Sequence, residues 1–108
     1  MEEVTLDTSQ MQWDELRGFP GTAEVKDLRE ESQCGAKTML VRLPAGGHVV
    51  PHTHPGAVQH YILEGEYESE GRTFRAGAYR LLPEHADVPP ISSEHGATLL
   101  IIYDPVTG

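Results

Sequence analysis

Turn-forming residues divide this sequence into short segments, and that division limits the folds that the chain can adopt. It carries 11 glycines and 8 prolines in 108 residues, and turn signals recur about every 8–12 residues. Between them lie runs that alternate apolar and polar residues, such as Ala36 to Leu43, where Met39, Val41 and Leu43 share one face. No helix of normal length fits between these turns. The pattern predicts an all-β domain of roughly ten short strands, arranged as a sandwich or a barrel.

The net charge and the cysteine content limit the classes of binding partner and the cellular compartment that we expect for this protein. The formal net charge is −9, which disfavours nucleic acid and anionic membranes as partners, since both require clusters of Lys and Arg. The longest apolar run, Leu99 to Ile102, is far too short to span a bilayer. The amino terminus lacks the form of a signal peptide, and the single cysteine, Cys34, excludes an intrachain disulfide. We therefore expect a cytoplasmic protein that does not bind membranes.

The beginning of the chain differs from the rest. Residues 1–20 are mixed and polar with a few apolar points, among them Trp13, and Gly18 and Pro20 would stop any helical turn there. We expect residues 1–20 to form an N-terminal arm that packs on the body with Trp13 as its anchor. Residues 21–108 are expected to form a single barrel.

Histidines are concentrated in residues 46–65, which hold four of the six in the chain, all at even positions. Side chains two residues apart in an extended chain point to the same side. His52 and His54 would then lie about 6.5–7 Å apart at their Cα atoms, a distance across which both imidazoles can reach one ion. After a turn at Pro55-Gly56, the next strand carries His60. These histidines form either a metal site or a buried polar cluster.

The same stretch resembles the first signature motif of the cupins, which are small double-stranded β-helix (jelly-roll) barrels. That motif is matched closely by Gly46 or Gly47, by His52-Thr53-His54 and by Tyr61 to Glu66. Gly77 and Pro83 match the first half of the second cupin motif. Within the superfamily the sequence is most similar to ChrR-like cupins, the barrel type found in some anti-sigma factors and in small ring- or diketone-cleaving dioxygenases. The resemblance covers most of the chain and implies an all-β cupin barrel.

Two positions that bind metal in the family hold valine here. The family's metal-binding Glu falls on Val58, and the metal-binding His of its second motif falls on Val88. The resemblance therefore leaves His52 and His54 as the ligands in place. His60 lies two residues beyond Val58 and faces the same side of its strand, so it is the candidate third ligand.

Three neutral imidazoles with open coordination positions suit a divalent transition metal such as Zn, Fe, Ni, Mn or Cu. The open positions would permit water activation or direct chelation of a substrate. The alternative is that His52, His54 and His60 form a hydrogen-bonded polar lining without a metal.

A possible pocket beside this site involves His48, Gln59, Tyr61 and His85. His48 is expected near the rim, with the substrate arriving on the side of His48 and Tyr61. Gln59 points away from His60 by strand alternation, unless a bulge follows the preceding turn. His85 stands where the family has a turn glycine, and a left-handed turn residue is the simpler interpretation. Surface placement is the default expectation for the strand arginines Arg42 and Arg80; the alternative is that they project into the barrel and hold an anionic substrate.

Two functions remain. The first is a cupin that binds a divalent metal and a small molecule in its barrel, and the resemblance implies a dioxygenase-like enzyme acting on a ketone or phenolic compound. The second is a non-catalytic barrel that binds a ligand or a partner through a degenerate metal site. In both cases we expect a homodimer, because the resemblance implies one. The last strand, Ala97 to Tyr103, also has apolar residues on both faces, and both need cover.

Overall fold

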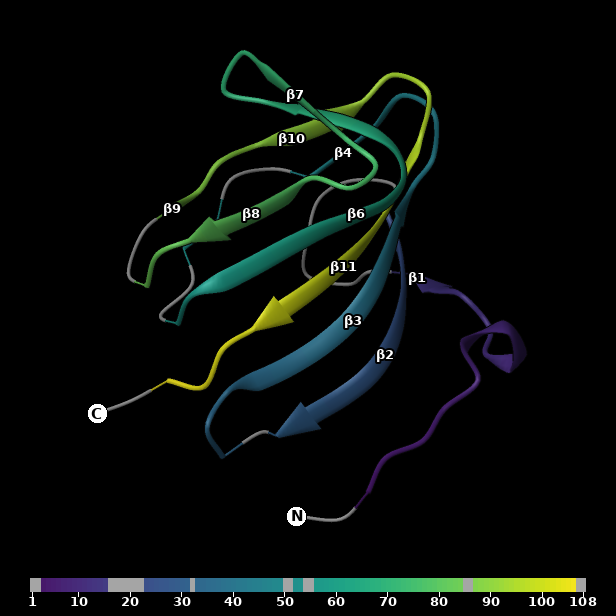
Figure 1. Ribbon diagram of the computed structural model, residues 1–108, viewed down its shortest axis with the longest axis vertical. Helices are drawn as coiled ribbons and strands as arrows, with labels where there is room; N and C mark the ends of the chain where they lie inside the picture. Colours follow the sequence, from purple (N-terminus) through teal and green to yellow (C-terminus); the bar gives the residue numbers. More distant parts are fainter. Residues whose placement is uncertain are drawn as a thin grey trace.

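The fold is all-β (Figure 1). The computed structural model describes residues 3–15, 23–31, 33–49, 52–53, 56–84 and 87–106, with the backbone alone at 52–53 and 87–88. The strands are β1 (Asp14–Glu15), β2 (Glu24–Glu31), β3 (Ala36–Leu43), β4 (Gly47–Val49), β5 (His52–Thr53), β6 (Val58–Ser69), β7 (Arg72–Arg75), β8 (Tyr79–Leu82), β9 (Asp87–Val88), β10 (Ile91–Ser93) and β11 (Ala97–Tyr103), preceded by the 3-10 turn η1 (Thr8–Gln10). The described segments include no helix that is long and apolar enough to cross a membrane.

Nine of the strands form one curled antiparallel sheet. Its order is β1-β2-β3-β11-β6-β10-β4, with β7 and β8 also paired to β6, while β5 and β9 form a separate two-stranded sheet. The twelve-residue β6 joins the two halves of the curl: its first part pairs with β11 and β8, and its second part pairs with β7 and β10. Figure 1 shows β2, β3, β11 and β6 side by side as one curved layer, with β4, β7 and β10 above it.

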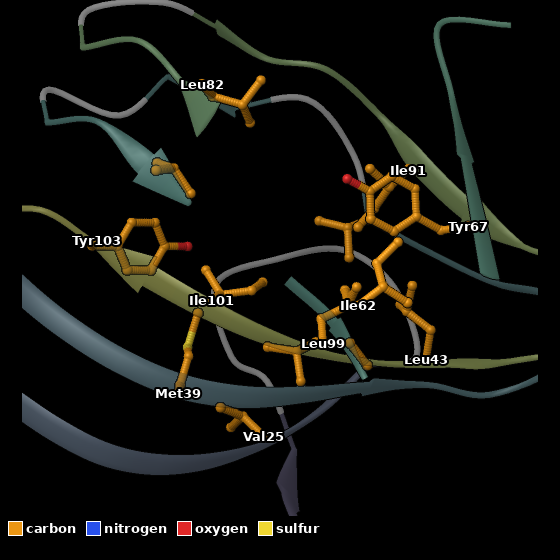
Figure 2. Close-up of a cluster of buried hydrophobic side chains, with 14 residues drawn as sticks. Val25, Met39, Leu43, Ile62, Tyr67, Leu82, Ile91, Leu99, Ile101 and Tyr103 are labelled. Atoms are coloured by element: carbon orange, nitrogen blue, oxygen red, sulfur yellow. The ribbon is translucent and has the colours of Figure 1, made fainter. Parts of the chain in front are cut away.

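The core fills the inside of this curl. The alternation predicted for Ala36 to Leu43 is confirmed, because Met39, Val41 and Leu43 are all buried. On β11 every second residue is buried, from Ala97 to Tyr103. Side chains from β3, β6, β8, β10 and β11 point toward one another in Figure 2. Each fully buried aliphatic side chain contributes roughly 1.5–3 kcal/mol, so this cluster is the main source of stability.

A bulge bends β6 between its two halves. The register with β11 shifts between Thr98 and Leu99, which leaves Leu63 without a cross-strand partner in that pairing. Two residues later, Gly65 has a φ of +73°, and a Cβ there would lie 2.1 Å from the carbonyl oxygen of Gly96. Only glycine fits this close approach of two backbones, and the bend lets one strand serve both halves of the sheet.

The described part of the N-terminal segment lies against β2 and β3. Trp13 contacts two cations, with Lys26 Nζ 4.6 Å and Arg42 Cζ 4.3 Å from its ring centroid. Lys26 Nζ also donates a hydrogen bond of 2.7 Å to the carbonyl oxygen of Thr8. Strand β1 pairs with the edge of β2. These contacts explain how Lys26 can be buried on the outer side of the sheet, where its charge meets a carbonyl and an aromatic face.

Candidate functional site

His60 is the one buried residue among the histidines whose side chains the structure describes, at 3% exposure. It points inward because β6 is extended and paired on both sides, so that Val58, His60 and Ile62 share the inner face. Its cross-strand partners are Ile101 on β11 and Arg80 on β8. The sequence-based expectation that His60 shares a face with Val58 is therefore met by the backbone geometry.

A buried polar cluster surrounds His60, formed with Tyr67 and Arg80. His60 Nδ1 lies 3.1 Å from Tyr67 Oη, and the two rings meet edge to face with an interplanar angle of 86°. Arg80 donates to Tyr67 Oη at 3.5 Å and to Glu70 Oε2 at 2.8 Å. Tyr67 is fully buried, whereas the side chain of Glu70 is half exposed. The cluster thus links the rim of the barrel at Glu70 to the interior at His60.

The charge of Arg80 is balanced inside this cluster. Only 8% of the Arg80 side chain is exposed, and its guanidinium contacts Glu70 and lies 4.8 Å from the centroid of Phe74. An unpaired buried cation would be costly, so the Glu70 carboxylate is what makes this placement acceptable. Burial raises the pKa of Tyr67, although the hydrogen bond from Arg80 opposes the shift. The Tyr67 hydroxyl therefore stays protonated at neutral pH.

The hydrogen bond between His60 and Tyr67 can run in either direction, depending on the imidazole tautomer. If Tyr67 donates to Nδ1, the neutral ring carries its proton on Nε2. If Nδ1–H donates to Tyr67 Oη, Nε2 carries no proton and can act as a metal ligand. The phenolic oxygen can accept from His60 and Arg80 together, because it has two lone pairs. The cluster is thus compatible with metal binding through Nε2.

The other two predicted ligands are described only in part. The backbone of His52 pairs with Val88 across β5 and β9, so the position expected for the second-motif histidine lies opposite the first motif. His54 lies outside the described residues, as does the side chain of His52. Within the described residues, no three His, Cys, Asp or Glu side chains gather closely enough to hold a metal ion. Val58, at the family's Glu position, is buried in the core.

The candidate pocket residues lie on the outer side of the sheet or outside the described residues. Gln59 and Tyr61 alternate with His60 and so face outward; Gln59 donates to Asp104 Oδ1 at 2.8 Å and accepts from the Tyr79 hydroxyl at 2.7 Å. The bulge in β6 falls beyond Gln59, at Leu63, and does not turn Gln59 inward. His85 is among the residues that the structure does not describe.

His48 is exposed at the rim, where it helps to line a hollow of about 320 Å³. The hollow opens between the end of β6 and the segment before β10. Its other lining residues are Val49, Glu68, Ser69, Glu70, Gly71, Pro90, Ile91 and Ser92. Strand alternation explains the placement, because Gly47 and Val49 on either side of His48 face inward. His48 therefore faces outward at the rim, whereas His60 faces the interior of the barrel.

The sequence matches the family of the ChrR cupin-like domain over residues 1–107. The chain belongs to this family. Its fold is accordingly the cupin jelly-roll barrel predicted from the histidine and glycine motifs. A search of curated proteins found no match.

Solved cupin structures are similar to this one over nearly its whole length. A candidate acetylacetone dioxygenase from Methylibium petroleiphilum aligns over 95% of this chain and 77% of its own, with a TM-score of 0.86 at 19% identity. Acetylacetone dioxygenase from Acinetobacter johnsonii aligns over 95% and 73%, with a TM-score of 0.77 at 16% identity. A structure of Rhodobacter sphaeroides SigE in complex with the anti-sigma factor ChrR aligns over 91% and 52%, with a TM-score of 0.73 at 21% identity. Structural matches at identities this low establish the cupin fold, but they do not establish an activity.

Sequence reasoning missed the role of Tyr67 and placed Arg80 on the surface of the cupin by default. A signal for Tyr67 was present, because it is the apolar residue within an acidic strand and has the opposite parity to Glu66 and Glu68. Glu64 and Glu68 on β6, and Glu70 in the turn that follows it, are exposed to solvent. The signal for Arg80 was its spacing from Leu82. The two residues are two positions apart on one strand, so Arg80 lies on the same face as the apolar Leu82, which is buried.

Burial also raises the pKa of Tyr103, at the end of β11. The folded cupin therefore holds this phenolic proton more tightly than the unfolded chain does. Its contribution to stability is complete below the unfolded pKa of about 10 and is lost as pH rises through the higher folded value. We expect the free energy of unfolding to fall above pH 10, by at most about 1.4 kcal/mol per pH unit for this group.

Urea unfolding followed across this alkaline range would measure the effect. A Tyr103→Phe variant should show a flatter fall than the wild type, because it has no proton to lose at this position. Curves of the same slope for both proteins would contradict the assignment to Tyr103.

Proposed function

We propose that this cupin binds a divalent transition metal through His52, His54 and His60, and that a small molecule binds beside the metal inside the barrel. The observation that carries the proposal is the position of His60. Its ring is buried on the inner face, and Nδ1 is held by Tyr67 at 3.1 Å. Metal-binding histidines are commonly oriented in this way, by a hydrogen bond to the ring nitrogen that does not bind the ion. In that tautomer His60 Nε2 would be the ligand atom.

The donor set is neutral, and this affects which ligands would be bound. Val58 replaces the carboxylate that the family uses, so three imidazoles would leave the full charge of the ion uncompensated. Arg80 adds no net charge, because Glu70 offsets it at 2.8 Å. A site of this kind favours an anionic oxygen ligand, such as an ionised phenol or the enolate of a ketone. Zn, Fe, Ni, Mn and Cu all remain suitable ions for it.

We further propose that the protein is a dioxygenase-like enzyme acting on a ketone or phenolic compound. The similarity in fold to the acetylacetone dioxygenase of Acinetobacter johnsonii and to the candidate acetylacetone dioxygenase of Methylibium petroleiphilum supports this class by analogy. When bound, the metal would supply Lewis-acid activation of a chelated substrate. Apolar side chains of the inner face, among them Ile62, Leu99 and Ile101, would exclude water from the reaction. Tyr67 and Arg80 would hold His60 in its orientation.

A second function is supported by Val58. This residue is 2% exposed and packs in the hydrophobic core, so it belongs to the barrel's packing and cannot coordinate an ion. The corresponding proposal is a non-catalytic cupin that binds a small molecule or a partner with a degenerate metal site. The cytoplasmic location expected from the sequence applies to both proposals.

Calorimetric titration of metal-free protein separates the two functions. Zn²⁺, Fe²⁺ under anaerobic conditions, Ni²⁺, Mn²⁺ and Cu²⁺ would be added in turn in the presence of a competing chelator. The metal-binding proposal predicts saturable binding of about one ion per chain for at least one of these metals. No saturable binding of any of them by correctly folded protein would support the non-catalytic barrel.

A further inference from the structure

The hollow beside His48, which we call the rim hollow, exists because β6 and β10 separate there. Within the described chain the two strands pair at one position, Ser92 with Glu68. Toward the start of β10, Pro90 has no backbone N–H with which to extend the ladder. The strands therefore diverge beside the turn between β6 and β7, which lies next to β10 in Figure 1. A volume of about 320 Å³ is at the lower end of the range for small-molecule sites.

Three polar side chains line the rim hollow in a row across three strands. Ser92 on β10 is the cross-strand partner of both His48 on β4 and Glu68 on β6. Directly opposite residues have Cβ atoms about 4.5–5.5 Å apart, so the imidazole, the hydroxyl and the carboxylate can contact one molecule bound between them. All three residues are exposed and line the hollow. Each of them can accept a hydrogen bond.

The carboxylate of Glu68 is the uncompensated charge of the rim hollow. Glu70 also lines the hollow, but it is paired with Arg80 at 2.8 Å and lies 3.8 Å from Arg72. Among the described residues, Glu68 has no ion-pair partner. The net charge of −9 adds a long-range attraction for cations. The rim hollow is therefore suited to a positively charged ligand.

A buried hydroxyl in the wall of the hollow lacks a partner. Ser69 is 3% exposed, and within the described structure its Oγ forms no hydrogen bond. An unpaired buried hydroxyl lowers stability, so native structures normally supply a partner for it. Because Ser69 lines the hollow, a hydrogen-bond donor bound there is the available partner for this oxygen. This observation is independent of the charge of Glu68.

We propose that the rim hollow binds a primary aliphatic amine in its protonated form. An ammonium group carries three N–H donors. In the gap between the diverging strands it is bounded by the oxygens of Glu68 and Ser92 on the outer side and of Ser69 on the inner side. Its alkyl chain would lie on the apolar side chains of the lining, which are Val49, Pro90 and Ile91. A metal ion is disfavoured here, because nowhere in the described residues do three His, Cys, Asp or Glu side chains gather around one point.

The amine site is separate from the proposed metal site. None of the residues that line the rim hollow is a proposed metal ligand. His48 faces outward at the rim, whereas His60 faces the interior. Amine binding is therefore expected for the metal-free protein, and the failure of either proposal leaves the other intact.

Titration of isotope-labelled, metal-free protein with n-hexylamine, followed by NMR, tests the proposal. At pH 7 the amine is protonated, and we expect saturable shifts of the Ser69, Gly71 and Ser92 amides with a dissociation constant of about 1 mM or below. Hexan-1-ol lacks the charge and hexyltrimethylammonium lacks the N–H donors, so each should bind at least about tenfold more weakly. Nα-acetyl-lysine methylamide presents the same ammonium group from a protein side chain. Tighter binding of this compound than of n-hexylamine would assign the ammonium to a lysine of a partner protein.

Two substitutions test the polar contacts. Glu68→Gln should weaken the binding of n-hexylamine at least about tenfold, because it removes the charge and keeps the shape of the side chain. Glu30→Gln is the matched control, since Glu30 is exposed on β2, does not line the hollow and loses the same charge. Ser69→Ala should weaken binding roughly fivefold. It should leave the urea unfolding midpoint unchanged or higher, because the hydroxyl that it removes has no partner within the described chain.

Saturable binding of n-hexylamine that Glu68→Gln weakens and Glu30→Gln does not would support the proposal. Shifts that do not saturate, or hexan-1-ol binding as tightly as n-hexylamine, would overturn it. Equal affinities of Glu68→Gln and Glu30→Gln would also overturn it. If Glu68→Gln fails to fold, the comparison of n-hexylamine with its two analogues on the wild-type protein decides the result.

Discussion

Replacing Gly65 with alanine should lower the free energy of unfolding by about 3 kcal/mol or more, enough to unfold a domain of ordinary stability. Two costs add. The φ of +73° is unfavourable for alanine, and the new Cβ would lie 2.1 Å from the Gly96 oxygen and 2.9 Å from the Ala97 Cα. These are backbone atoms of a paired strand, and Glu66 N–H already donates to that oxygen at 3.3 Å. The neighbours therefore cannot move aside without breaking the pairing of β6 with β11.

Gly71 supplies the control for this experiment. Its φ of +75° is almost the same, but a Cβ there would meet no atom within 4 Å. Gly71→Ala should cost only the backbone term, about 1–2 kcal/mol. Urea unfolding followed by circular dichroism measures both variants. Equal losses of stability would show that the close approach at the bulge is not what requires glycine at position 65.

Substituting His60 by leucine should weaken metal binding by more than roughly 100-fold while the barrel stays folded. The variant would retain His52 and His54 alone as imidazole ligands. Leucine is close to histidine in size, and Tyr67 would lose one hydrogen-bond partner but keep its contact with Arg80. The structural cost should therefore be modest beside the loss of affinity. Calorimetric titration with the metal that binds the wild type measures the change.

His95→Leu is the matched control for this prediction. The side chain of His95 is 71% exposed at the rim and pairs with Glu66 at 3.2 Å. The same substitution there should leave metal affinity at the wild-type value. An affinity of His60→Leu that equals that of His95→Leu would remove His60 from the ligand set.

Local alternation made much of this fold predictable. The strands from Ala36 to Leu43 and from Ala97 to Tyr103 have the predicted bounds, because both are paired along their whole length in the middle of the sheet. The face shared by Met39, Val41 and Leu43 is the predicted one. The polar composition of the segment from Ser92 to Gly96 favours a turn, but β10 continues through Ser93. Ser92 and Ser93 pair with His48 and Gly47, and such a distant partner leaves no trace in a local pattern.

The site was predictable to a lesser extent. The inward direction of His60 followed from its parity with Val58, and the structure places both on the inner face. The contacts of Arg80 could not be read in the same way, because a strand arginine is normally exposed. Its burial depends on Glu70, which reaches it from the end of β6, and on Tyr67 from the middle of the bend. Those contacts exist only after β6 has bent at Gly65.

The metal content of protein purified without an affinity tag tests the central claim most directly. The metal content of the wild-type protein would be measured by elemental mass spectrometry. A His52→Ala/His54→Ala double variant, prepared in the same way, would be measured beside it. We expect about one divalent transition metal ion per wild-type chain and almost none in the double variant. Equal, near-zero metal in both proteins would contradict the proposed metal site.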